Sequence, residues 1–233
     1  MNYGDIEKQT FKTYLTFSTV ILALILAFFT ISSTGYRVNS IIYEVSRDLE
    51  YGSLERLKGT SIWLIDDTYF NLFYEENPTV EKITIRKELP STLLVSVKLA
   101  EKIAFIEDSR QNPTKEIVLY KNLFVSEAGL NDGLMRVFIS NGPVEEGFNE
   151  ELVTFVMTIK KYPIDISKIV MNFDGFVLTL NYFQTYINLG SPSDLARKAA
   201  VVGYYLEEPS CKGEIRLVYS DNNEDISAIS NCK

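Results

Sequence analysis

The feature that most constrains this chain is an apolar run near its start. Residues 15–32 read LTFSTVILALILAFFTIS and contain no charged side chain. An α-helix of that length rises about 27 Å, close to the hydrocarbon thickness of a bilayer. Lys8 and Lys12 precede the run, which favours a cytoplasmic N-terminus. The run therefore predicts a retained transmembrane helix over residues 14–34, behind a short cytoplasmic tail of residues 1–13.

A cleaved signal peptide is the alternative explanation of the same run. Signal peptides normally have a shorter apolar region and an A-x-A cleavage site, and no such site follows residue 32. No other stretch of the sequence is apolar over a comparable length. The expected location is the cell membrane, with a single pass and with everything after about residue 36 outside the cytoplasm.

Composition excludes several classes of function. The formal net charge is −8, and no concentrated basic segment offers the surface that nucleic-acid binding needs. The sequence has no histidine, which removes the commonest general base and the commonest metal ligand. Its two cysteines, Cys211 and Cys232, lack the spacing of a structural zinc site. They are either unpaired or joined in a disulfide that flanks the last predicted strand.

Motifs for covalent catalysis and for phosphate binding are also missing. Serine–histidine and cysteine–histidine catalysis both require histidine, and the sequence has no G-x-x-x-x-G-K loop. An S-x-x-K pair occurs only at Ser230 and Lys233, at the chain's end. Residues 221–225 begin like a calcium loop, but Ile226 stands where that loop needs glycine. We therefore expect no enzyme activity, cofactor, metal, small-molecule substrate or bound nucleic acid.

After the apolar run, the first half of the chain predicts the order strand, helix, helix, strand, strand. Residues 37–49 have strand character, and a helical turn is expected to end near Gly59. Asp66 or Asp67 is expected to cap a second helix, which must end by Asn77 because Pro78 follows. Alternating apolar residues then predict two strands, one around residues 83–85 and one over residues 93–99.

The second half predicts a mainly antiparallel β domain with two helices, so the predicted fold class is α+β. Strands are expected at 116–126, 134–140, 166–173, 176–182, 185–190 and 214–220, with one helix at 148–161. Ser191, Pro192 and Asp194 predict the start of the other helix, because serine caps well and proline fits the first helical position. A polar tail is expected to complete the chain.

The order of these segments and their motifs resemble the bacterial cell-division proteins FtsQ and DivIB. That family's G-x-S-I-F-like strand, N-P-x-V helix end and R-x-x-P-x-T-L turn are similar to residues 59–63, 77–80 and 86–93. Its E-R-x-P-V-A motif is replaced by EKIA at residues 101–104, without the proline. The stretch from INLGSPSDL to GEIRLVYSD is similar to the family's second domain. The resemblance covers nearly the whole chain, although no single motif is diagnostic.

The resemblance implies a POTRA domain at residues 35–108 and a β-rich FtsQ/DivIB-type domain, with its polar tail, at residues 109–233. It implies a non-enzymatic, membrane-anchored scaffold that binds FtsB/DivIC-like and FtsL-like membrane proteins at the division septum and supports septum formation. Other divisome proteins are a further class of partner. Partner binding by edge-strand pairing is expected at Leu217, Val218, Tyr219, Asp221 and Ile226. The competing expectation is that Leu217 and Tyr219 simply face the core.

Two other functions fit the same sequence. The chain is then either a POTRA-containing accessory protein of transport or secretion, or a membrane-anchored enzyme. A division scaffold predicts co-purification with two small coiled-coil proteins, whereas a transport accessory predicts a different client and normally carries several POTRA units. An enzyme requires an activity that disappears on a single polar substitution.

Overall fold

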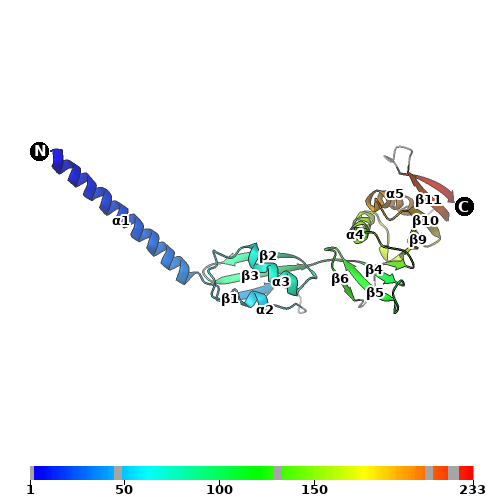
Figure 1. Ribbon diagram of the computed structural model, residues 1–233, viewed down its shortest axis with the longest axis horizontal. Helices are drawn as coiled ribbons and strands as arrows, with labels where there is room; N and C mark the ends of the chain where they lie inside the picture. The colour runs from blue at the N-terminus through cyan, green and yellow to red at the C-terminus, as the bar shows by residue number, and fades with distance from the viewer. Residues whose placement is uncertain (1–2, 45–48, 128–132, 208–211, 220–225, 233) are drawn as a thin grey trace. The chain divides into compact units, whose positions relative to one another are not determined.

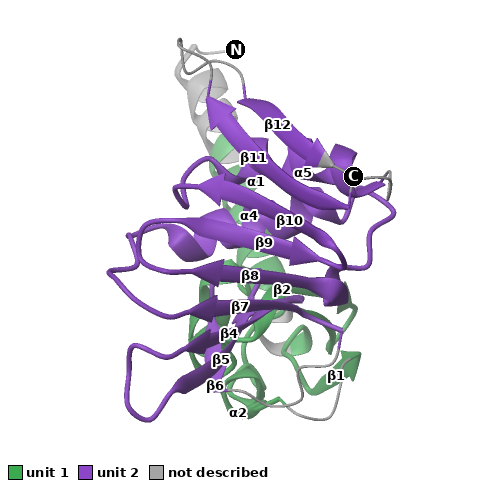
Figure 2. Cartoon of the chain, turned by 90° about the vertical axis from the view of Figure 1, so that its right-hand side faces the viewer, with its two compact units in different colours: residues 1–99 green, residues 100–233 purple. Residues whose placement is uncertain are grey.

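The computed structural model describes the chain except for residues 1–2, 45–48, 128–132, 208–211, 220–225 and 233, and it describes no side chains for residues 3–13, 31–34 and 232. The chain divides into two compact units, residues 1–99 and 100–233 (Figure 2). The boundary thus follows Leu99. Strand β4 (Lys102–Asp108), which the sequence assigned to the first domain, belongs to the second unit.

Helix α1 (Tyr3–Gly35) contains the apolar run (Figure 1). Within the residues that the structure describes, no helix has both the length and the apolarity that crossing a membrane requires. The predicted transmembrane helix at 14–34, and the single-pass membrane location that depended on it, are therefore wrong. Within α1, the hydroxyls of Thr19 and Thr30 donate to backbone carbonyls of the preceding turn.

Beyond α1, unit 1 contains a three-stranded sheet with the order β1-β3-β2. Strand β1 is parallel to β3, and β2 is antiparallel to it. The elements follow in the order β1 (Ser40–Glu44), α2 (Gly52–Glu55), η1 (Asp67–Phe70), α3 (Asn71–Glu76), β2 (Val80–Glu88) and β3 (Thr92–Leu99). The chain order after α1 is thus strand, helix, helix, strand, strand.

The helical segment of unit 1 begins and ends at the predicted residues. Asp66 precedes η1, and its carboxylate accepts a hydrogen bond from the Thr68 backbone N–H at 3.0 Å. Asn77 ends α3, and its buried side-chain amide donates to the carbonyls of Glu50 and Phe73. The unit's core consists of buried apolar side chains from helices and sheet, among them Leu54, Ile62, Phe70, Phe73, Leu93 and Val95.

Unit 2 is built on one nine-stranded sheet with the order β12-β11-β10-β9-β8-β7-β4-β5-β6 (Figure 2). Besides β4, its strands are β5 (Lys115–Tyr120), β6 (Val125–Glu127), β7 (Met135–Ile139), β8 (Ile169–Phe173), β9 (Leu178–Tyr182), β10 (Thr185–Gly190), β11 (Gly213–Tyr219) and β12 (Ile226–Cys232). Helices α4 (Phe148–Ile159) and α5 (Leu195–Glu207) bury their apolar sides against it.

The sheet of unit 2 is mixed: its strand pairs are mainly antiparallel, as predicted, but three of them are parallel. Strand pairs β4–β7, β7–β8 and β10–β11 are parallel. Helix α4 connects β7 to β8, and α5 connects β10 to β11, so each helix returns the chain to the same end of the sheet. The α+β class therefore holds for the described part of the chain, with two parallel crossovers that the strand patterns did not reveal.

Helix α5 begins three positions later than the sequence predicted, at Leu195 and not at Pro192. Ser191 does not cap it, because the helix starts at Leu195 and the preceding Asp194 has φ 55°. The Leu195 backbone N–H donates instead to the carboxylate of Glu151 on α4, at 2.7 Å. The Lys198 N–H donates to the Asp194 carbonyl at 3.2 Å. The start of this helix is thus stabilised by a tertiary contact, which satisfies a backbone donor that a local cap would otherwise serve.

The end of the chain also differs from the expected polar tail. Residues 226–232 form strand β12, which pairs antiparallel with β11 along its whole length, from Ile226 opposite Tyr219 to Cys232 opposite Gly213. Cys211, the other half of the hypothetical disulfide, lies outside the described residues. The last strand of the sheet is therefore β12, and β11 is an internal strand.

Candidate partner-binding edge

Strand β12 forms one edge of the nine-stranded sheet. Among the described strands, β11 is its sole neighbour, so the outer side of β12 has no strand partner. An edge of this kind offers backbone N–H and C=O groups to another chain. The predicted binding strand, β11, has no such free side, because β10 pairs with it on one side and β12 on the other.

The two faces of β12 differ because successive side chains alternate. Ile226 and Ala228, opposite Tyr219 and Leu217, are partly buried against the main core of the unit. On the other face, Ile229 is 63 % exposed. One face of the edge strand is thus anchored on the fold, and the other carries an unusually exposed apolar side chain.

The structure separates the predicted partner-binding residues into different roles. Leu217 is buried in the core, which the competing expectation had allowed. Val218 points to the opposite face and is 37 % exposed. Tyr219 is half-buried and its hydroxyl donates to Asp194 at 3.2 Å. Asp221 lies outside the described residues, and Ile226 is the one predicted residue on the edge strand itself.

A polar cluster around the buried Lys198 connects the end of β11 to the start of α5. The Lys198 side chain is fully buried, and its ammonium donates to the Ser191 carbonyl at 2.6 Å and lies 5.4 Å from the centre of the Tyr219 ring. Burial lowers the pKa of Lys198, although the charges of Asp194 and Glu151 oppose the shift. Burial and the neighbouring Asp194 carboxylate raise the pKa of Tyr219. These contacts join α5 to the end of β11 and so help to position the strand pair.

Charge distinguishes β12 from the other edge strands. Its sequence, ISAISNC, has seven residues and no charged side chain. The edge strand β2 of unit 1 has nine residues, VEKITIRKE, five of them charged, and β6 has only three residues, one of them Glu127. Folded proteins commonly protect exposed edges with charged side chains or with short strands. Among the described edges, β12 is the long one that lacks both protections.

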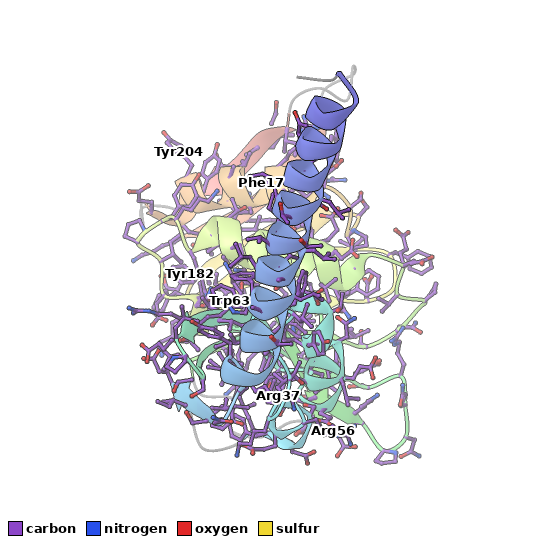
Figure 3. The ribbon with its side chains drawn as sticks, turned by 90° about the vertical axis from the view of Figure 1, so that its left-hand side faces the viewer. Phe17, Arg37, Arg56, Trp63, Tyr182 and Tyr204 are labelled. Atoms are coloured by element: carbon purple, nitrogen blue, oxygen red, sulfur yellow. The ribbon has the colours of Figure 1, made fainter. Side chains whose placement is uncertain are left out.

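Sequence reasoning missed Ser227, Ala228 and Ile229 as edge residues. The run 226–232 contains few large apolar side chains, so its alternation is weak and it resembles a polar tail. One sequence feature could have indicated this edge strand: residues 226–232 carry no charge, whereas the chain as a whole has a net charge of −8. On α5, Tyr204 (labelled in Figure 3) is 62 % exposed, and its ring centroid lies 5.6 Å from that of Tyr205.

The remaining candidate is an acidic hollow at the start of α4. A cavity of about 300 Å³ is lined by Glu145, Glu146, Glu150 and Glu151 together with Pro192 and Ser193. Within the described residues, no three acidic or cysteine side chains are placed to hold a metal ion. The hollow therefore gives no basis for a metal centre, and β12 is the stronger candidate for function.

Comparisons with known proteins give no family assignment. No protein-family model matches the chain, and no curated protein matches it. The resemblance to FtsQ and DivIB rests on the sequence motifs alone.

Proposed function

We propose that this chain is a non-enzymatic scaffold of the FtsQ/DivIB type in bacterial cell division. It binds FtsB/DivIC-like and FtsL-like proteins by accepting a strand of a partner at the open edge of β12, and in this way supports septum formation. The site residues of the proposal are those of the edge and the face beside it, Val218, Ile226, Ser227, Ala228 and Ile229.

The observation that supports the proposal is the long, uncharged edge of β12. A strand added there gains main-chain hydrogen bonds along about 23 Å, at about 3.3 Å per residue. The anchoring of Ile226 and Ala228 against the core gives that edge a fixed position. Fixing one partner in advance lowers the entropic cost of association.

The alternation of β12 also specifies the partner strand. Its side chains must alternate in the same register, with apolar residues on the side of α5 and polar or mixed residues on the side of Ile229. Charge on the helix side of the incoming strand would be buried without a partner, which is costly. The proposal therefore requires a partner segment with period-two apolar alternation.

The test is co-expression of the full chain with the FtsB/DivIC-like and FtsL-like proteins of the same organism, followed by size-exclusion chromatography. Ile229→Lys adds a charge to the edge while replacing an exposed side chain, so the variant is expected to fold and to lose co-elution. Ile42→Lys on edge strand β1 is the matched control, since Ile42 is 49 % exposed. It is expected to co-elute like the wild type.

Absence of co-elution for the wild type at tens of micromolar would refute the division-scaffold proposal. Equal loss of binding in Ile229→Lys and Ile42→Lys would refute β12 as the site. Far-UV circular dichroism and thermal unfolding of both variants establish that the comparison is made between folded proteins.

A further inference from the structure

A second recessed surface lies at the end of the sheet where β12 finishes. It is a cavity of about 470 Å³ lined by the turn between β9 and β10, the last part of α5 and the start of β11. Its lining consists of Tyr182, Phe183, Gln184, Thr185, Tyr205, Leu206 and Lys212. Cavities that bind a ligand or an anchoring side chain commonly have this size and this largely apolar character.

Phe183, which lines this cavity, has an energetically unfavourable backbone conformation. It occupies the first position of the two-residue turn between Tyr182 and Thr185, with φ 51°, in the left-handed region that glycine, asparagine and aspartate prefer. Its side chain is 74 % exposed. Among the aromatic ring pairs of the described residues, Phe183 takes part in one, an edge-on contact with Tyr182 at 4.7 Å between ring centroids. A large apolar residue that is both strained and exposed indicates a binding role more than a folding role.

The charge of this cavity is opposite to that of the chain. Among the described residues that line the cavity, Lys212 is the one ionised side chain, whereas the protein as a whole carries a net charge of −8. A cation at the rim of an aromatic wall favours a ligand that combines an apolar group with a carboxylate. The cavity is thus suited to a large apolar side chain with an acidic neighbour.

The strand register places this cavity within reach of a partner on β12. Thr185 of β10 is opposite Gly213 of β11, and Gly213 is opposite Cys232 of β12. From a strand added beyond β12, the turn of β9 and β10 lies three strand spacings away, about 14 Å at about 4.8 Å each. About four or five extended residues cover that distance.

We propose that this cavity is a second subsite for the same partner, which receives a large apolar side chain flanked by a carboxylate. The occupying residues lie about four or five positions beyond the segment that pairs with β12, on the side of the partner strand that leaves the sheet at Cys232. This inference rests on the proposed function and adds a specificity determinant to it. The backbone edge accepts many strands, and the cavity selects among them by chemistry.

The decisive variant is Phe183→Gly, because glycine relieves the backbone strain while deleting the ring. Isothermal titration of the full chain with the FtsB/DivIC-like protein is expected to show about tenfold weaker binding, which corresponds to about 1.4 kcal/mol. The melting temperature is expected to stay equal or to rise, since glycine adopts positive φ without strain. A purely structural Phe183 would instead give a lower melting temperature with unchanged affinity.

Lys212→Glu tests the charge and Phe176→Gly serves as the matched control. Lys212→Glu is expected to weaken binding about tenfold at low salt and to reduce the salt dependence of the affinity. Phe176 is 79 % exposed and lies in the neighbouring turn between β8 and β9, so Phe176→Gly is expected to change the affinity less than about twofold.

The outcomes separate the two proposals. Wild-type affinity in both Phe183→Gly and Lys212→Glu, with binding lost in Ile229→Lys, overturns the cavity and leaves the edge intact. Equal weakening by Phe176→Gly also overturns the cavity, because the effect is then one of general surface hydrophobicity. Failure of the wild-type chain to bind the partner overturns the proposed function together with the subsite.

Discussion

Strands β2 and β12 are the long edge strands of their respective sheets, and only β2 is protected by charged side chains. In β2, Lys82 is opposite Lys98, and Glu81 forms an ion pair with Lys98 at 2.8 Å, so charges line the strand and its neighbour. In β12, serine, alanine, isoleucine and asparagine take the corresponding places. Incoming strands must desolvate or repel the charges of β2, whereas β12 presents backbone groups without that penalty.

The difference shows that an open edge requires support from within the fold. Strand β12 contributes Ile226 and Ala228 to the side of the core, and its neighbour β11 is fixed by Leu217 and by the contact between Tyr219 and Asp194. The outer face carries the exposed Val218 and Ile229. Buried and exposed residues thus alternate along the same two strands.

The largest effect on the free energy of unfolding is expected from truncating the buried side chain of Leu217. Leu217→Ala should lower the free energy of unfolding by about 2–4 kcal/mol, because it removes a buried side chain and leaves a cavity. Val218→Ser, one residue away on the exposed face, should change it by less than about 0.5 kcal/mol. Urea unfolding followed by circular dichroism measures both, and equal losses would contradict the division between the two faces.

A smaller effect is expected from an ion pair of unit 2 in which the carboxylate, Asp108, is buried. Asp108, at the end of β4, accepts from the Arg110 guanidinium at 2.8 and 2.6 Å, and Arg110 also donates to the Gly142 carbonyl. This pairing with Arg110 lowers the pKa of Asp108. Asp108→Asn should cost about 1.5–3 kcal/mol at pH 7, the range for hydrogen bonds to charged groups.

The free energy of unfolding is also expected to depend on pH through Asp108. Since the folded-state pKa of Asp108 lies below its unfolded value of about 3.9, the stabilisation is present above that pH and is lost as the pH falls through the folded-state pKa. Unfolding free energies measured from pH 7 down to pH 3 should therefore decline more steeply for the wild type than for Asp108→Asn. Parallel pH curves would contradict this assignment.

The smallest effect on stability, and the sharpest test of the comparison, comes from removing charge from β2. Lys82 and Arg86 are exposed residues of this edge. The double variant Lys82→Thr, Arg86→Thr should change the unfolding free energy by less than about 1 kcal/mol. It should nevertheless increase self-association, which analytical ultracentrifugation at rising protein concentration detects. A strictly unchanged sedimentation profile would show that charge is not what protects β2.

The sequence predicted those parts of the structure that local patterns control. The alternation over 93–99 and the signals at Asp66 and Asn77 located a strand and a helical segment of unit 1 correctly, because these depend on neighbouring residues. The start of α5 was misplaced because its first backbone donor is satisfied by Glu151 from α4. The parallel pairs escaped prediction because strand order is a tertiary property.

The edge that we propose as the binding site is one strand away from the one that the sequence predicted. The sequence located Val218 and Ile226 beside the edge, but it assigned the edge to β11, because the weak alternation of residues 226–232 concealed β12. The apolar run led to a membrane span that the described helix does not support. Phe183 was not singled out, since neither its positive φ nor its exposure has a signature in a run of alternating residues.

The uncharged edge of β12 also has a consequence for folding in the absence of the proposed partner. Strand β11 and β12 are close in sequence, so they pair early, whereas parallel partners such as β4 and β7 must be brought together across long stretches of chain. During that interval β12 is exposed on an incomplete sheet, a situation that promotes aggregation. Cells that make this chain in excess of its partner should accumulate insoluble material, and co-synthesis of the partner should raise the soluble yield.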